Sequence, residues 1–284
     1  TDGNIDITST KKGISGKDSV RIADGTINIT TGTDGIHSEN SDDTSKGFVY
    51  IEGGTITINA ADDGIHAGTT LDIVGGKINI TQSNEGLEGK DVNISGGEVN
   101  VVSSDDGING SGSTTVAAVE AAKTATKTTT TTNNGRGGGG SMQDTGEKIL
   151  ISGGTITVNA GGDGIDSNGS VEISGGNTIV YGPTDGGNGA LDSNGEFLVS
   201  GGTLLAIGSS GMAESPSTNS SQGWLQASAS GNANSTVTIK DSSGKVLANI
   251  KAAKTFQNVV FSSADVSNGQ SYTVSVDSNS TSVT

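Results

Sequence analysis

The chain has 284 residues, including 47 glycines and no cysteine, and carries a formal charge of −16. The lack of cysteine excludes disulfides, thiolate metal sites and a cysteine nucleophile. Nucleic acid is excluded as a partner because neutralising phosphates requires clustered Lys and Arg, and the only two arginines are Arg21 and Arg136.

A repeat runs through most of the chain. Its first part, apolar-x-apolar-x-Gly-Gly, occurs at 49–54, 71–76, 92–97, 149–154, 171–176 and 197–202. An alternating segment such as 55–60 follows, and then an acid-Gly-apolar step such as Asp63-Gly64-Ile65. Counted from Gly13, the glycines of these steps lie 22, 29, 22, 21 and 57 residues apart. The repeat unit, which we call a coil, is therefore 21 or 22 residues long, with insertions.

Strict alternation of apolar and polar residues predicts three short strands in each coil, with Gly at the corners between them. One coil cannot bury its own apolar face, but stacked coils bury a continuous column of Ile and Val. The pattern fits neither a hexapeptide repeat nor a leucine-rich repeat. The sequence therefore predicts an all-β fold, a right-handed parallel β-helix, over residues 1–230.

Two insertions interrupt the repeat, a polar loop at 38–46 and a long segment at 111–148 that we expect to be flexible. A different rhythm follows from residue 236, with apolar segments at 237–239, 246–250, 259–261 and 272–276 and a turn at 242–244. This pattern is typical of antiparallel strands. Residues 231–284 are therefore predicted to form a small antiparallel β cap on or beside the solenoid.

Stacking the coils aligns one acid per corner, at Asp34, Asp63, Glu85, Asp106, Asp163 and Asp185, with His37, His66, Glu88, Asn109 and Asp166 three positions later. Carboxylates about 4.8 Å apart, the spacing of paired strands, repel by about 1 kcal/mol in water and about 3.5 kcal/mol at an effective dielectric of 20. Calcium binds oxygen at roughly 2.3–2.6 Å, so two ligands on opposite sides of one ion are also about 4.8 Å apart. A calcium ion therefore fits between neighbouring coils.

We predict several calcium ions in two groups of ligands. The first comprises Asp62, Asp63, Glu85, Glu88, Asp105 and Asp106, and the second comprises Asp163, Asp166, Asp185 and Asp192. The alternative for any one acid is that Asp before Gly simply favours the turn. Softer transition metals are less expected, because the donors are oxygens and the chain has only two histidines.

Sugar contacts are harder to assign from the sequence. His37 and His66 occupy equivalent outward positions and are metal ligands, sugar contacts or, most simply, solvated side chains. The outward Thr and Asn of the alternating segments form a polar row that suits an ordinary solvated sheet, sugar hydroxyls or an ice-binding array. Aromatic residues are few, and only Tyr50, Tyr181 and Trp224 are outward candidates. The candidate carbohydrate contacts are His37, Tyr50, His66, Asn79 and Asn100.

These features resemble the bacterial family of carbohydrate-binding domain-containing proteins. The segments that carry the resemblance are 151–159, 162–170, 182–184, 187–192, 208–213, 215–217 and 239–246. The resemblance implies a calcium-binding right-handed parallel β-helix that is similar in fold to pectate lyases. It also implies a secreted or cell-surface protein that binds cellulose-like or acidic plant polysaccharide, such as polygalacturonate.

We therefore expect a noncatalytic, calcium-loaded carbohydrate-binding protein. One alternative is a calcium-dependent lyase, in which Lys or Arg removes a proton that calcium acidifies. Bases near the acids are scarce, since only Lys77 and Lys90 lie between Asp63 and Asp106. Another alternative is a structural stalk or adhesin. No transmembrane stretch or signal peptide is present, so we expect a mature chain that does not insert into membranes; the sequence does not indicate its oligomeric state.

Overall fold

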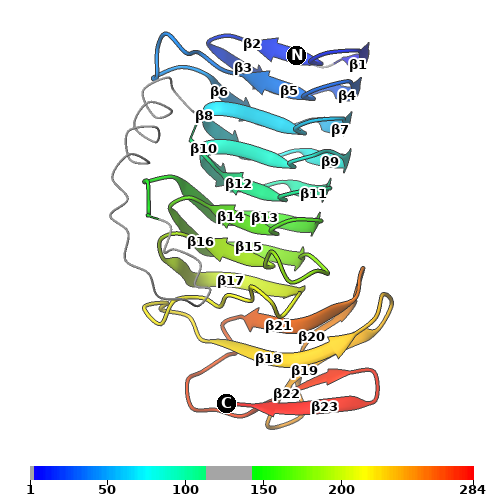
Figure 1. The fold of residues 1–284 in the computed structure, drawn as a ribbon, viewed down its shortest axis with the longest axis vertical. Helices are drawn as coiled ribbons and strands as arrows, with labels where there is room; N and C mark the ends of the chain where they lie inside the picture. Colours follow the sequence, from blue (N-terminus) through cyan, green and yellow to red (C-terminus); the bar gives the residue numbers. More distant parts are fainter. Residues whose placement is uncertain (1–2, 113–142) are drawn as a thin grey trace, which may run out of the picture.

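The structure is a computed structural model that describes residues 3–112 and 143–284 (Figure 1). These residues form an all-β fold without helices, and most of the strands lie parallel in one large sheet. No helix in the described part is long and apolar enough to cross a membrane. Most of the predicted 111–148 insertion lies outside the described residues. The predicted all-β class is confirmed.

The strands follow one another closely along the chain. In order, they are β1 Asn4–Ser9, β2 Ile14–Gly16, β3 Ser19–Ile22, β4 Thr26–Thr31, β5 Ile36–Ser38, β6 Phe48–Ile51, β7 Thr55–Ala60, β8 Ile65–Ile73, β9 Lys77–Gln82, β10 Leu87–Ile94, β11 Glu98–Ser103, β12 Ile108–Gly110, β13 Lys148–Ala160, β14 Ile165–Ser167, β15 Ser170–Tyr181, β16 Leu191–Ser193, β17 Phe197–Gly208, β18 Trp224–Gly231, β19 Thr236–Asp241, β20 Val246–Lys251, β21 Phe256–Ser262, β22 Tyr272–Val276 and β23 Asn279–Val283.

Each strand of a coil pairs in parallel with the matching strand of the next coil. One series of pairs runs from β1 through β4, β7, β9, β11, β13 and β15 to β17. A second runs from β2 through β5, β8, β10, β12 and β14 to β16. A third runs from β3 through β6, β8, β10, β13 and β15 to β17. The arrangement is β-helix-like, with coil stacked on coil (Figure 1).

The core of the stack is a column of branched apolar side chains. Because side chains alternate across a strand, every second residue of β7 points inward, and Ile56 and Ile58 are fully buried. They lie in register with Ile78 and Ile80 of β9. Matching inward residues therefore stack on one another from coil to coil. The outward residues that alternate with them are thereby also aligned between coils.

The second glycine of each Gly-Gly pair forms a corner that requires a positive φ. Gly97, for example, has φ of 88°, and a Cβ built there would lie 2.8 Å from the carbonyl oxygen of Gly76 in the preceding coil. Glycine is needed both for the left-handed backbone and for the close approach of the two coils. The repeated Gly-Gly pair is thus explained by the geometry of the stack.

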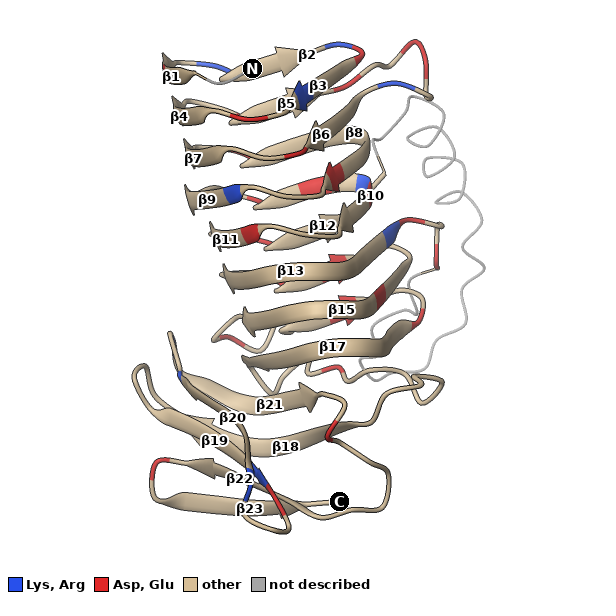
Figure 2. Cartoon of the chain, turned by 180° about the vertical axis from the view of Figure 1, so that it is seen from behind, with Lys and Arg blue, Asp and Glu red and all other residues tan. Residues whose placement is uncertain are grey.

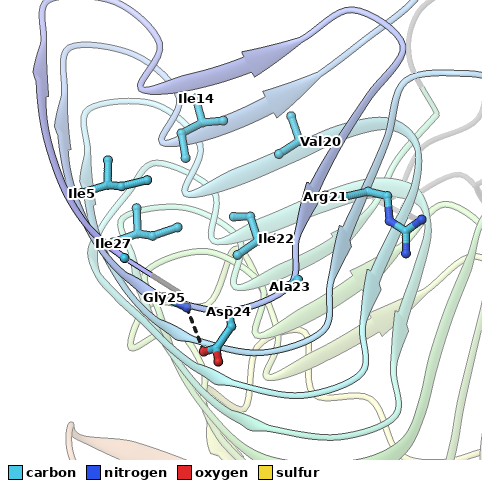
Figure 3. A pocket seen from close by; sticks show the side chains of 10 residues that line it. Ile5, Ile14, Val20, Arg21, Ile22, Ala23, Asp24, Gly25 and Ile27 are labelled. Carbon is cyan, nitrogen blue, oxygen red and sulfur yellow. Dashed lines mark hydrogen bonds between the residues drawn. The ribbon is translucent and has the colours of Figure 1, made fainter. Parts of the chain in front are cut away.

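The N-terminal end of the column is open. Ile5, Ile14, Val20, Ile22 and Ile27 point into a hollow of about 220 Å³ inside the first coil, while Arg21 points outward (Figure 3). Ile5 is 48% exposed. The first coil therefore closes its core less completely than the coils that follow it.

The C-terminal end of the column is covered by antiparallel strands. β21 pairs with both β17 and β18 and so belongs to the large sheet. β20, β19, β22 and β23 form a separate antiparallel sheet. A second apolar core lies here and includes Leu225, Val237, Phe256 and Phe261. Residues 231–284 therefore contribute to two sheets rather than to one.

Candidate cation and carbohydrate site

Two rows of mostly polar residues follow the corner between the first and second series of strands. The corner row, aligned by backbone hydrogen bonds between coils, contains Lys12, Asp34, Asp63, Glu85, Asp106, Asp163 and Gly189. The strand row, three positions later in each coil, contains Ser15, His37, His66, Glu88, Asn109, Asp166 and Asp192. Figure 2 shows acidic positions recurring from coil to coil.

The alignment predicted for Asp185 is wrong. The register pairs Asp166 with Asp192, and the Gly164 amide bonds to the Gly189 carbonyl, so Gly189 occupies the position equivalent to Asp163. Asp185 lies earlier, in the loop between β15 and β16, where it is exposed and accepts a hydrogen bond from the Gly187 amide at 2.9 Å. A few additional residues in this loop displace the acid from the corner row.

Basic side chains accompany the acids at the N-terminal end of the two rows. Asp34 lies 2.7 Å from His37 Nδ1 and 3.4 Å from Lys12 Nζ. His66 Nδ1 lies 3.3 Å from Asp63 and hydrogen-bonds to Glu88. The two imidazole rings stack with their centroids 4.7 Å apart and their planes 11° apart.

The expectation that these histidines are solvated is also wrong. His37 is only 8% exposed, and His66 is half-buried. Burial lowers the pKa of His66, but hydrogen bonds to Asp63 and Glu88 outweigh it and raise this pKa to about 10. His66 is therefore a cation at neutral pH, which joins Asp63 to Glu88 across two coils.

The acids of the following coils have no such cation. Burial, followed by repulsion from neighbouring acids, raises the pKa of Glu85 to about 7 and that of Asp166 to about 8. Burial likewise raises the pKa of Asp106 to about 6 and that of Asp163 to about 7. In the described part of the chain, no Lys, Arg or His comes within 4.0 Å of these four carboxylates. Their charges repel one another in a partly desolvated corner.

Asn109 lies among these acids and has an acceptor without a partner. It is 7% exposed and stands between Glu88 and Asp166 in the strand row. Its Nδ2 donates to Glu85 at 2.9 Å, whereas its buried Oδ1 has no hydrogen-bond partner among the described residues. An amide oxygen and carboxylates form a donor set that suits a hard divalent cation. The sequence marked Asn109 only by its position in the row.

The other predicted metal ligands lie at the edges of this corner. Asp62 and Asp105 precede the corner acids and are exposed, although Asp62 offers an oxygen close to those of Asp34 and Asp63. Asp192 is half-buried and repels Glu214, an acid that the sequence did not single out; burial together with this repulsion raises the pKa of Glu214.

The five predicted carbohydrate contacts do not form one site. His37 and His66 belong to the strand row, and Tyr50 lies on β6 in the third series of strands, 4.9 Å from the guanidinium of Arg21. Asn79 and Asn100 pair in the first series, on β9 and β11. The candidates are thus distributed over three series of strands.

One comparison relates the chain to known proteins. Residues 1–128 match the family model described as carbohydrate-binding domain-containing protein, which confirms the resemblance to this family over the N-terminal part of the chain. Neither the curated proteins nor the solved structures contain a match. The family match supports binding of carbohydrate.

Proposed function

We propose that this protein is a noncatalytic carbohydrate-binding protein, built as a right-handed parallel β-helix, that holds calcium between its coils and recognises polysaccharide outside the cell. The family match over residues 1–128 supports the carbohydrate ligand. Parallel pairing of strands one coil apart supports the solenoid. The resemblance described above supports the proposed location at the cell surface or in the medium.

The calcium proposal depends on one observation, the uncompensated acids around Asn109. Four acids here are half-buried and have raised pKa values, namely Glu85, Asp106, Asp163 and Asp166. The unpartnered Oδ1 of Asn109 lies among them and would be a further oxygen ligand for a cation. Calcium would replace the lost hydration of these groups and neutralise them. The donors are all oxygens, so the residues present fit calcium.

Calcium held at this corner would also attract an acidic polysaccharide, which the protein would otherwise repel because its net charge is −16. Coordination positions left open by the protein would accept uronate carboxylates, as in polygalacturonate. A lyase would need a Lys or Arg base beside these acids. Among the described residues, Lys12 is the only Lys or Arg within 4.0 Å of a corner acid, and it contacts Asp34 at the opposite end of the row. This arrangement supports binding without catalysis.

The test is a pull-down of folded protein on insoluble polygalacturonate, with millimolar calcium or with excess chelator. We expect binding only with calcium, and a large loss of binding in Glu85→Gln and Asp106→Asn, which keep side-chain size but remove charge. Asp241→Asn, a change of equal charge at the half-buried end of β19, is the matched control and should bind normally. Equal binding with and without calcium would overturn the bridging role.

Asp166→Asn tests the ion separately from the sugar. The folded-state pKa of Asp166 is raised to about 8 from 3.8, so its ionisation opposes folding increasingly as the pH rises through this window. In chelator at pH 8, the variant should therefore melt at a higher temperature than the wild type. It should also lose most of the stabilisation by calcium. A calcium-induced rise in Tm equal to that of the wild type would exclude Asp166 as a ligand.

A further inference from the structure

A cleft lies in the C-terminal part of the molecule, outside the family match. The segment 218–223, the first residues of β18, the loop 266–268 after β21 and Thr284 line an open cleft of about 760 Å³. This volume is within the usual range for small-ligand sites, roughly 300–1,000 Å³. In Figure 1, both segments lie on the same side of the stack as the C-terminus.

The lining of this cleft carries no charged side chain. It consists of Ser, Thr, Gln and Asn with Trp224, Leu225, Val266 and a glycine. In a chain with 31 acids and 15 basic residues, such a surface stands apart from the acidic corner rows. No charged side chain lines this cleft to pair with a charged ligand, whereas a neutral polyhydroxylated ligand would find hydrogen-bond partners.

Trp224 supplies the aromatic surface. It is the only tryptophan of the chain and is half-buried because it packs in part against the column core, whereas its neighbour Leu225 is buried in the C-terminal core. Alternation along β18 therefore places Trp224 and Gln226 on the same face of the strand. The apolar C–H faces of a pyranose stack well on an indole ring, whose remaining surface stays accessible beside the polar lining.

The walls of the cleft are held together before any ligand arrives. Gln222 Nε2 donates to Ser262 Oγ at 2.8 Å, and Ser262 Oγ donates to the Gly223 carbonyl at 2.8 Å. A Cβ at Gly223 would lie 2.2 Å from the Val266 carbonyl, so glycine permits the two segments to touch. A preformed cleft loses little conformational freedom on binding.

Polar groups at the cleft are available to a ligand. Within the described residues, the side chains of Ser221, Gln226 and Asn268 make no hydrogen bond to the protein, whereas Gln222 is fixed by its bonds to Gly202 and Ser262. Each amide offers both a donor and an acceptor, the combination that sugar hydroxyls need.

We propose that this cleft binds a neutral pyranose saccharide, stacked on Trp224 and hydrogen-bonded by Gln226 and Asn268, without calcium. The site adds a second ligand class to the proposed function and is independent of the corner rows. The protein would then hold an acidic and a neutral glycan at two separate places along the stack.

The single tryptophan provides a local readout. Fluorescence of the full chain is titrated with cellohexaose, xylohexaose and mannohexaose, each with calcium and with chelator. We expect a saturable change with at least one neutral oligosaccharide, with the same affinity in both conditions, and none with oligogalacturonate. No change with any neutral probe, or a change that requires calcium, would overturn the proposal.

Variants then test the residues. Gln226→Ala and Asn268→Ala should each weaken binding about fivefold, as expected for the loss of one hydrogen bond. Gln270→Ala, an exposed glutamine of the same loop outside the lining, is the matched control and should bind normally. Trp224→Ala should abolish binding, as measured by calorimetry once its fold has been checked.

Unchanged affinity in both Gln226→Ala and Asn268→Ala would exclude this cleft even if the fluorescence responds. Loss of uronate binding leaves this test unaffected, so the two proposals fail separately.

Discussion

The change in character between His66 and Glu85 divides the corner of this protein into two electrostatic regions. On one side, Lys12 and two histidines accompany the acids. On the other side, Glu85 and Asp166 face further acids, with no basic side chain of residues 3–112 and 143–284 paired to them. The acids of this corner are therefore neutralised by basic side chains in one region and, by our proposal, by a bound metal ion in the next.

The protonation of His66 is a direct prediction from this arrangement. Asp63 and Glu88 raise its pKa to about 10 from 6.5. The stability that this cation contributes is fully present below pH 6.5 and is lost as the pH rises through 10. In NMR spectra at pH 8, the imidazole of His66 should therefore still show the shifts of the charged form. Assignment of that signal by His66→Gln is the check, and a neutral His66 at pH 8 would contradict the ion triad.

The alignment of these two rows could be predicted from the sequence, but the burial and contacts of the individual residues could not. Periodicity was enough to align Asp63, Glu85, Asp106 and Asp163, because strand pairing copies the spacing of the repeat. It failed at Asp185, because the loop before β16 contains an acid-Gly step that does not form the corner. The burial of His37 was not predictable, since it depends on stacking against His66 and on contact with Asp34.

At the scale of the strands and corners, the Gly-Gly pairs limit what the repeat tolerates. Gly97 and Gly244 have nearly equal φ values, 88° and 89°. Only Gly97 lies against another coil, since a Cβ at Gly244 would meet nothing within 4 Å. A substitution at Gly244 therefore measures backbone strain alone, whereas one at Gly97 measures backbone strain together with steric contact.

Gly97→Ala should destabilise the protein more than Gly244→Ala does. Strain in the left-handed region alone costs about 1–2 kcal/mol, and overpacking against the Gly76 carbonyl adds about 1–3 kcal/mol for Gly97. Chemical denaturation of both variants, beside the wild type, measures the difference. Equal losses of stability would mean that the coils separate easily at this corner.

β21 shows where sequence patterns stop being informative. The apolar residues at 259–261 indicate a strand, but consecutive buried residues carry no alternation that selects one face. Val260 belongs to the column core, whereas Val259 and Phe261 belong to the C-terminal core. A strand buried on both faces fits more than one partner, so its position between β17 and β18 could be seen only in three dimensions.

At the scale of the whole molecule, β21 joins the stack of coils to the C-terminal sheet. Truncation after Gly231 removes β21 and exposes the edges of β17 and β18, which should cause aggregation through unpaired strands. Truncation after Val276 removes only the largely exposed β23 and is the control. Light scattering after size exclusion compares the two. A soluble, monomeric protein ending at Gly231 would show that the stack needs no such cover.

Register also governs how this molecule is able to change over evolutionary time. Each coil places its inward residues on those of its neighbours, as Ile56 and Ile58 do on Ile78 and Ile80, so gain or loss of one residue within a strand would turn apolar side chains outward. Duplication of a whole coil preserves every contact and lengthens the stack by about 4.8 Å. Proteins of this architecture should therefore differ in length by whole coils, and each added coil would bring one more position to both rows of the corner.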